Sequence, residues 1–184
     1  GRIAGTLVET YLGRDAGLAE SISTAHENPR YHPGIVLPDS MRGTTDPADA
    51  LDGAEIVVLA VPAQSLRDNL GSWRDLLADG SLLVSLMKGI EQGTTRRMSE
   101  VAAEVADVDP ARVAVVSGPN LAREIAERQP AATTVACTDA DAAQEFIDAY
   151  FAGFPRVRAF IDGTLENARR TGMVKTLFGR RRLV

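Results

Sequence analysis

The sequence is poor in the residues that build disulfides, metal centres and membrane spans. It holds one cysteine, Cys137, and two histidines among 184 residues, so we expect no intramolecular disulfide and no Cys/His metal site. Its longest apolar run, residues 56–63, is far shorter than the roughly 20 residues that cross a bilayer. The first residues lack the basic and then apolar pattern of a signal peptide. These absences predict a cytoplasmic protein with no bound metal and no membrane span.

Lysine is also scarce, and charge is unevenly distributed. Arginine supplies 18 of the 20 basic residues, which leaves Lys88 and Lys175. All 25 acidic residues lie at or before Glu166 with only 14 basic ones, so this body carries a net charge of −11. Such a body is a poor general binder of nucleic acid, and we expect no nucleic-acid partner. The last 18 residues carry +6 and are interpreted as a solvated terminus, the alternative being a segment that touches phosphate.

The composition that remains is that of a globular protein. Hydrophobic residues make up 45% of the chain and charged residues 24%, which excludes disordered, collagen-like and coiled-coil chains. The length allows one domain, or one domain and a small further piece. We therefore divide the chain into a domain over residues 1–160 and a final segment over residues 161–184.

Strand-like and helical segments alternate along the first 160 residues. This order is typical of an α/β protein with a doubly wound, mainly parallel sheet. The continuous apolar segment 55–61 suits a parallel strand that is covered on both faces. Asp46 and Asp139 are expected to cap helices, and the proline-rich segment 28–38 is expected to be a rigid loop. Strands are predicted over residues 6–13, 55–61, 81–87, 112–116, 131–137 and 156–160, and helices over 16–26, 48–51, 65–77, 94–106, 121–127 and 140–151.

Unusual residues follow the predicted parallel strands, at the sheet edge where open α/β sheets bind ligands. Lys88 comes directly after segment 81–87, where its ammonium can meet a phosphate or a carbonyl oxygen. The alternative is an ordinary exposed lysine at the start of a loop. Residues 117–120 (Ser-Gly-Pro-Asn) precede a predicted helix and offer backbone N–H groups to an anion, or simply cap that helix.

Two further features bear on a dinucleotide. Arg14 follows the first predicted strand, where an arginine suits an adenosine 2′-phosphate. The glycine-rich turn of a dinucleotide site, G-x-G-x-x-G, is missing, because residues 1–5 have neither the preceding strand nor the first Gly-x-Gly pair. The residues alone thus predict an α/β domain with an edge suited to phosphate and an incomplete cofactor site.

Four motifs in order resemble the bacterial NAD(P)-dependent glycerol-3-phosphate dehydrogenases. The resemblance runs from about residue 10 to residue 148 and implies a Rossmann-like fold without its usual first strand and glycine-rich loop. It fades after residue 148, so that 161–184 is interpreted as a remnant of a helical substrate domain or a frayed tail. The motifs are HENPRYHPGIVLP (26–38), EIVVLAVPAQSLR (55–67), VSLMKGIEQGT (84–94) and VVSGPNLAREIA (115–126).

The resemblance also implies roles for single residues. Lys88 would contact both cofactor and substrate, Gly118 and Asn120 would hold glycerol 3-phosphate, Ala122 would touch the cofactor and Arg14 would approach the adenosine ribose. The catalytic lysine of the family opens a helix after Gly-Ala-Leu and before Asn. Lys175, in Gly-Met-Val-Lys-Thr, is the similar residue here, although Thr replaces Asn and the upstream spacing differs.

The activity implied by the resemblance is hydride transfer between NAD or NADP and dihydroxyacetone phosphate. The product would be sn-glycerol 3-phosphate for glycerophospholipid synthesis, and a homodimer would require a complete second domain. One alternative is a related dehydrogenase of a hydroxy acid or a sugar acid. Another is a truncated remnant without catalysis, which the missing glycine-rich loop favours. In either case we expect this chain to bind cofactor weakly and to have little activity.

Overall fold

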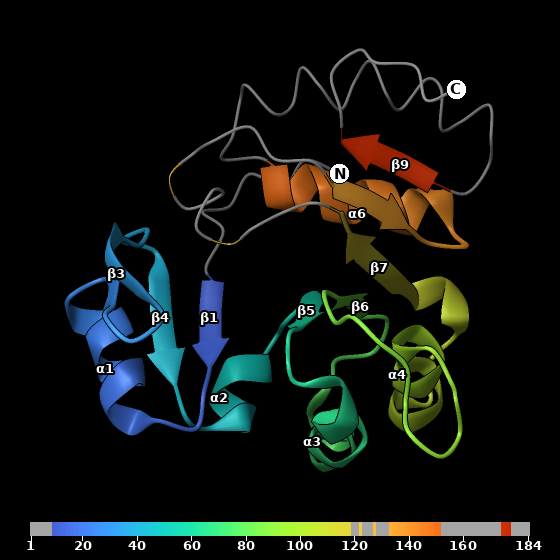
Figure 1. Cartoon of the computed structure of the whole chain (residues 1–184), viewed down its shortest axis with the longest axis horizontal. Coiled ribbons are helices and arrows are strands. Elements are labelled where there is room, and N and C mark those ends of the chain that lie inside the picture. The colour runs from blue at the N-terminus through green and yellow to red at the C-terminus, as the bar shows by residue number, and fades with distance from the viewer. Residues whose placement is uncertain (1–8, 119–121, 123–126, 128–132, 152–173, 178–184) are drawn as a thin grey trace.

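The structure is a computed structural model, and it describes residues 9–118, 122, 127, 133–151 and 174–177 (Figure 1). Its largest element is a five-stranded sheet in the order β5-β6-β7-β8-β9. The strands are β5 (Ile56–Leu59), β6 (Leu82–Ser85), β7 (Val113–Ser117), β8 (Thr133–Ala136) and β9 (Val174–Leu177). Helices cover both faces of this sheet, and the predicted α/β fold class is confirmed.

Strands β5, β6 and β7 run parallel, with Val58 opposite Val84 and Val84 opposite Ala114. Strand β8 runs antiparallel to β7, and β9 antiparallel to β8. The parallel part was predicted correctly, whereas the direction of β8 was not. A strand covered on both faces has the same continuous apolar pattern in either direction, so the pattern carries no information on direction.

Two apolar clusters explain why residues 82–84 of β6 are all apolar. Leu83 packs with α3 (Leu66–Trp73) and α4 (Met98–Ala106) on one face of the sheet. Leu82 and Val84 pack with α6 (Ala140–Phe151) on the other face. All three side chains have no exposed surface. Alternate residues of β6 therefore enter opposite clusters, and the strand ends at Ser85, a polar side chain that is also fully buried.

The N-terminal part of the chain forms a separate pair of strands beside this sheet (Figure 1). Strand β1 (Glu9–Leu12) pairs in parallel with β4 (Met41–Thr44). Helix α1 (Ala16–Thr24) packs closely on β4, and α2 (Pro47–Leu51) follows that strand. Among the described residues, β1 and β4 pair only with each other, so the sheet predicted as one is divided into two.

The proline-rich segment 28–38, predicted as a loop, contains a strand. Strand β3 (His32–Val36) pairs with β2 (Glu27–Asn28) in an irregular antiparallel hairpin. The prediction was wrong because proline is tolerated on an edge strand, where the nitrogen that lacks a hydrogen need not join a ladder. Pro33 lies within such an edge strand.

Capping residues fix several helix starts as predicted. The side chain of Asp46 accepts a hydrogen bond from the Ala48 backbone nitrogen at 2.9 Å, and that of Asp139 accepts one from Asp141 at 2.8 Å. Helix α4 begins four residues later than predicted, because Gly93 and Thr95 have positive φ angles of 86° and 58°. The short 3-10 turns are η1 (Ala63–Ser65), η2 (Arg74–Leu76) and η3 (Pro110–Arg112).

Some predicted elements lie outside the described residues. These are the strand over 156–160 and nearly all of the helix over 121–127. Within 161–184 the structure describes only β9, and the division of the chain at residue 160 stays a prediction. In the described part of the chain, no helix has the length and apolar character needed to span a bilayer. The same residues include no group of three His, Cys, Asp or Glu side chains suited to a metal ion.

Candidate functional site

The carboxyl ends of β5, β6 and β7 lie at one edge of the sheet, because these three strands are parallel. Pro62 follows β5, Lys88 follows β6 and Gly118 follows β7. Strand β6 lies between the other two, so Lys88 comes from the middle of this edge. The sequence prediction that these strand ends meet at one edge is therefore confirmed.

Lys88 is exposed and leaves the sheet just after its last backbone hydrogen bond. The Leu86 nitrogen still donates to the Leu59 oxygen at 3.0 Å, and three residues later the chain turns at Gly89, whose φ is +108°. No ion pair or hydrogen bond joins the Lys88 ammonium to another side chain in the part of the chain that the structure describes. An ammonium without such a partner can bind an anionic ligand without first breaking an existing ion pair.

Arg14 reaches the same region from the other strand pair. It follows β1 and precedes Asp15, the residue that caps α1. Its guanidinium is exposed and donates to Asn69 Oδ1 at 3.1 Å. Asn69 lies in the first turn of α3, which begins soon after the carboxyl end of β5. The structure thus brings Arg14 close to the start of α3, beside the edge that carries Lys88.

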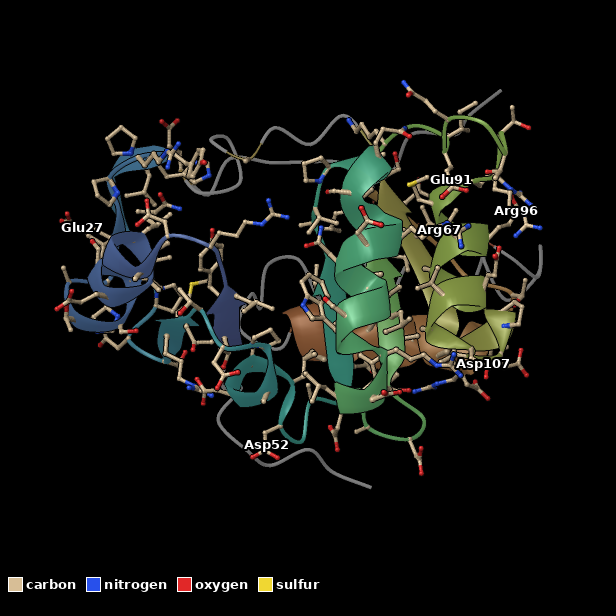
Figure 2. All side chains as sticks on the ribbon, turned by 90° about the horizontal axis from the view of Figure 1, so that it is seen from below. Glu27, Asp52, Arg67, Glu91, Arg96 and Asp107 are labelled. Atoms are coloured by element: carbon tan, nitrogen blue, oxygen red, sulfur yellow. The ribbon has the colours of Figure 1, made fainter. Side chains whose placement is uncertain are left out.

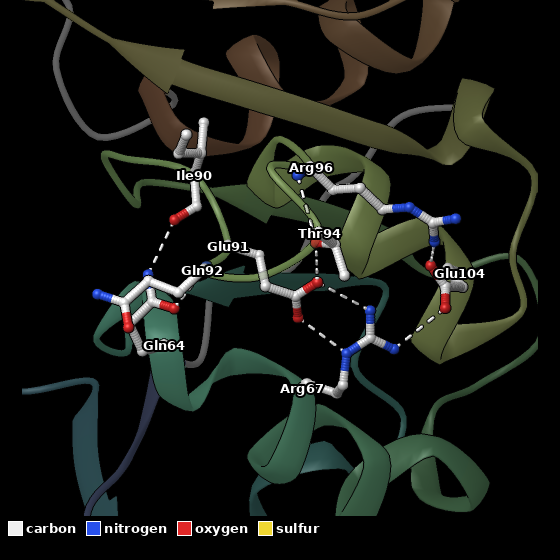
Figure 3. A network of polar contacts seen from close by, with 8 residues as sticks. All are labelled: Gln64, Arg67, Ile90, Glu91, Gln92, Thr94, Arg96 and Glu104. Carbon is white, nitrogen blue, oxygen red and sulfur yellow. Dashed lines mark hydrogen bonds and ion pairs between the residues drawn. The ribbon is translucent and has the colours of Figure 1, made fainter.

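The loop that carries Lys88 is bound to the segment after β5 by side chains that the sequence reasoning missed (Figure 3). Gln64 donates from Nε2 to the Ile90 oxygen at 2.8 Å and accepts at Oε1 from the Gln92 nitrogen at 2.9 Å. Its amide therefore bonds to the backbone on both sides of Glu91. A glutamine next to a strand end has no sequence signal that would reveal such a contact, since its partners lie 26 and 28 residues away.

Arg67 and Glu91 form a two-pronged ion pair beside this contact. Arg67 Nε and Nη2 donate to the two Glu91 carboxylate oxygens at 2.8 Å and 3.1 Å. The Thr94 hydroxyl also donates to Glu91, whose side chain is only 13% exposed. These bonds, above all those from Arg67, lower the pKa of Glu91 from its ordinary 4.5 to about 2. Glu91 is thus a permanent anion at neutral pH that ties the loop to α3.

A second ion pair extends this network to α4. Glu104 accepts from Arg67 Nη1 at 3.1 Å and also pairs with Arg96. Figure 2 shows Arg67, Glu91 and Arg96 gathered at one end of the helix pair α3 and α4, while Asp107 lies at the other end. Both helices begin at the carboxyl edge of the sheet, so the network supports the same edge that carries Lys88.

The remaining predicted site residues are placed unevenly. Gly118 is half-buried directly after β7, next to the end of β6. Asn120 lies outside the described residues, and Ala122 is described as an exposed helical residue. Lys175 lies within β9 opposite Val135, rather than at the start of a helix. Because β7 and β8 separate β9 from β6, the structure does not bring Lys175 beside Lys88.

A hollow of about 560 Å³ lies at the opposite edge of the sheet, by the amino ends of β6 and β7. Its arginines already have acidic partners, Arg74 with Asp107 at 2.7 Å and Arg112 with Glu145 at 3.1 Å. Both arginines that line the hollow are thus already paired and are not free to bind a ligand. We therefore assign the candidate site to the carboxyl edge.

Comparison with protein families matches most of the chain to one family. Residues 5–143 match the family described as NAD-dependent glycerol-3-phosphate dehydrogenase N-terminus. A glycerol-3-phosphate dehydrogenase (NAD(P)+) of Streptomyces griseus is 51% identical over 170 residues, which cover 92% of this chain and 50% of that protein. One of Thermobifida fusca is 58% identical over 134 residues, 72% of this chain and 40% of that protein. The chain thus spans about half the length of the curated relatives it matches.

Solved structures show the same fold. The glycerol-3-phosphate dehydrogenase of Coxiella burnetii superposes with a TM-score of 0.69 at 23% identity, over 76% of this chain and 42% of that one. The enzyme of Saccharomyces cerevisiae gives a TM-score of 0.64 at 28% identity, over 73% of this chain and 40% of that one. The predicted Rossmann-like architecture is therefore confirmed.

The end of the chain has a second likeness. Residues 127–184 match the family described as DNA polymerase family A. This range includes Lys175, which lies beyond the range of the dehydrogenase match, whereas Arg14, Lys88 and Gly118 lie within that range. Because the dehydrogenase match covers most of the chain and close relatives share half of its residues, the chain belongs to the glycerol-3-phosphate dehydrogenase family.

Proposed function

We propose that this chain provides the cofactor-binding part of an enzyme that transfers a hydride between NAD(P)H and dihydroxyacetone phosphate. The product is sn-glycerol 3-phosphate, a precursor of glycerophospholipids. The observation that carries the proposal is Lys88, which is exposed and without a partner among the described residues, at the middle of the carboxyl edge; it follows the strand next to the one that Gly118 follows. The family match supports this substrate over a hydroxy acid or a sugar acid.

The described residues suit an anionic dinucleotide at one end of the site. Arg14 presents an exposed guanidinium, and Lys88 presents an ammonium that is free of partners in the described part of the chain. Two cations at one edge fit the charge of NAD(P)H, and an arginine after this strand suits the adenosine ribose or its 2′-phosphate. When bound, NAD(P)H supplies the hydride. The chain contributes the contacts that orient it, including Ala122 at the start of the next helix.

Substrate is held by the residues around β6 and β7. Lys88 provides a point charge for the phosphate or the carbonyl oxygen, and the backbone at Gly118 together with Asn120 provides hydrogen bonds. Holding the reacting carbon of the substrate against the cofactor supplies a large part of the rate acceleration, because this orientation removes the entropy cost of bringing the two together. Lys175 as the general acid stays a prediction, and its place within β9 gives that prediction no support.

The other properties of the family are proposed on the same basis. The enzyme acts in the cytoplasm, takes NAD or NADP, and forms a homodimer through the second domain of a full-length protein. It does not act on nucleic acid. Activity of this chain by itself is expected to be low. A catalytic group must be held in its productive position, since a displacement of about 1 Å can cost about 100-fold in rate.

Titration with glycerol 3-phosphate tests the proposal. We expect wild type to bind it at low salt, and Lys88→Ala to abolish binding while barely changing the melting temperature, because an exposed lysine packs little. Arg74→Ala is the matched control, since Arg74 is an exposed cation at the opposite edge. Equal affinity in wild type and Lys88→Ala would remove Lys88 from the site, and a large fall in melting temperature would give it a structural role.

A further inference from the structure

The turn that carries Lys88 has little apolar packing beyond Met87, which packs against the apolar cluster of α3 and α4. Ile90 is 52% exposed, and a Cβ placed on Gly89 would meet only the Ala63 side chain, at 3.9 Å. The regular sheet hydrogen bonds end at Leu86. A glycine turn without buried side chains samples many conformations unless polar contacts restrict it. The position of the Lys88 ammonium thus depends on the hydrogen bonds of the loop.

Two kinds of contact restrict this loop. One kind lies within it: the Glu91 nitrogen donates to the Arg96 oxygen at 2.8 Å, and Ile90 and Arg97 form a bridge. These contacts shape the loop but do not attach it to the sheet. The other kind crosses to the segment after β5, through Gln64 and Arg67. Of these two, Gln64 lies nearer in sequence to the end of β5 and bonds to the backbone at Ile90, two residues from Lys88.

We propose that Gln64 is a positioning residue that holds the Lys88 turn against the end of β5, and so places the ammonium for its ligand. The side-chain amide acts like one more peptide unit, because it donates to Ile90 and accepts from Gln92 at the same time. A carboxylate cannot donate, so glutamate at this position keeps at most one of the two bonds. The segment that carries Gln64 is itself fixed, since the Ser65 nitrogen and hydroxyl both donate to the Pro62 oxygen at 2.9 Å.

The proposal rests on the proposed function of Lys88, and it gives Gln64 a role through the loop backbone at Ile90 and Gln92 rather than through the ligand. A turn that is competent for only part of the time weakens apparent affinity by that fraction. Removing the Gln64 contacts therefore reduces affinity without removing any ligand contact. Gln64 is exposed, so its loss leaves both apolar clusters intact.

The experiment compares Gln64→Ala and Gln64→Glu with wild type. Gln144→Ala is the matched control, since Gln144 makes a side-chain hydrogen bond on α6, away from the loop. Hydrogen exchange of the Leu86 and Glu91 amides reports on the turn, because these amides donate to the Leu59 and Arg96 oxygens at 3.0 Å and 2.8 Å and neither bonds to Gln64. We expect exchange at both to rise about tenfold in Gln64→Ala and less in Gln64→Glu, with the melting temperature unchanged. We expect affinity for glycerol 3-phosphate to fall about tenfold in parallel.

Each outcome decides one of the two proposals. Unchanged exchange at Leu86 and Glu91 in Gln64→Ala overturns the positioning role, whatever the ligand binding shows. A fall in melting temperature that matches the change in exchange also overturns it, because Gln64 would then stabilise the whole fold. Failure of wild type to bind glycerol 3-phosphate overturns the proposed function instead. In that case the exchange of the two amides still decides whether Gln64 holds the turn.

Discussion

Gly43 is the residue at which the packing of α1 on β4 leaves the least space. A Cβ placed on Gly43 would lie 2.5 Å from the Ala19 oxygen and 2.7 Å from the Ala19 Cα. Both contacts are with backbone, which cannot swing aside as a side chain can. In addition, the Gly43 nitrogen donates to Ser23 Oγ at 2.9 Å, and that hydroxyl donates to the Gly43 oxygen at 3.1 Å. The two elements are thus held together at this glycine.

We expect Gly43→Ala to lower the free energy of unfolding by about 1–3 kcal/mol, the usual cost of overpacking. The measurement is urea denaturation followed by circular dichroism. Gly71→Ala is the control, at an exposed position of α3 where a new Cβ would meet only Val105 Cγ1 at 3.8 Å. Alanine in a helix interior should raise stability by about 0.5–1 kcal/mol. A Gly43→Ala chain as stable as wild type would mean that α1 does not pack on β4 as described.

Single residues show where sequence reasoning succeeds at this scale. The place of Lys88 was predictable because a strand pattern that ends at Met87 leaves the next residue at the sheet edge. The roles of Gln64 and Glu91 were not, because their partners lie 24 to 28 residues away in sequence. Arg67 and Glu91 have opposite charges, but nothing local pairs these two rather than any other arginine and acid of the chain.

The contact between the loop and α3 is the element whose stability depends most clearly on pH. The pKa of Glu91 is about 2 in the folded chain and 4.5 ordinarily. A lowered carboxylate pKa adds stability that is complete above the unfolded pKa and is lost as pH falls through the folded pKa. We expect Glu91→Gln to be less stable than wild type by a constant amount from pH 7 to pH 5. The difference should shrink between about pH 4.5 and pH 2.

Denaturant titrations of the two proteins across this pH range measure the effect. Glu100 also has a pKa lowered to about 2, through Arg97, so wild type alone would combine both groups. Subtracting the free energy of unfolding of Glu91→Gln from that of wild type at each pH isolates the contribution of Glu91. Glu100→Gln gives the contribution of Glu100 in the same way. A difference that stays constant down to pH 2 would mean that the Glu91 charge does not stabilise the fold.

Elements were predictable where one local cause determines them. Residues 82–84 of β6 are apolar because both faces of that strand are covered, whereas β5 leaves Val58 47% exposed. Asp46 with Pro47 is a sufficient signal for the start of α2. Strand β3 was not predicted because its segment is rich in proline. Proline fits both in a loop and on an edge strand, and sequence alone does not distinguish the two. Helix α4 begins later than predicted because the chain turns at Gly93 and Thr95, and the predicted helix wrongly included Thr95.

At the scale of the whole molecule, long-range pairing was the least predictable property. The parallel order of β5, β6 and β7 follows from the helices between them, since such crossovers join parallel strands. By the same rule the helix predicted over residues 121–127 would make β8 parallel to β7, but β8 is antiparallel, and no pattern predicted that β9 pairs with it. Strand β9 lies in the range that also matches DNA polymerase family A. The resemblance to the dehydrogenases therefore did not help to predict this strand.

The uneven charge of the chain leads to a prediction about nucleic acid. The body to Glu166 carries −11, whereas the last 18 residues carry +6 and lie in the range with the polymerase likeness. The larger negative charge should repel a polyanion, so we expect no binding to a 20-base-pair DNA duplex at 150 mM NaCl by fluorescence anisotropy. If all six basic residues met phosphates, log affinity would instead fall with log salt concentration at a slope of about −5. Binding with a steep slope, weakened when Arg180, Arg181 and Arg182 are changed to glutamine, would contradict the prediction and assign DNA contact to this segment.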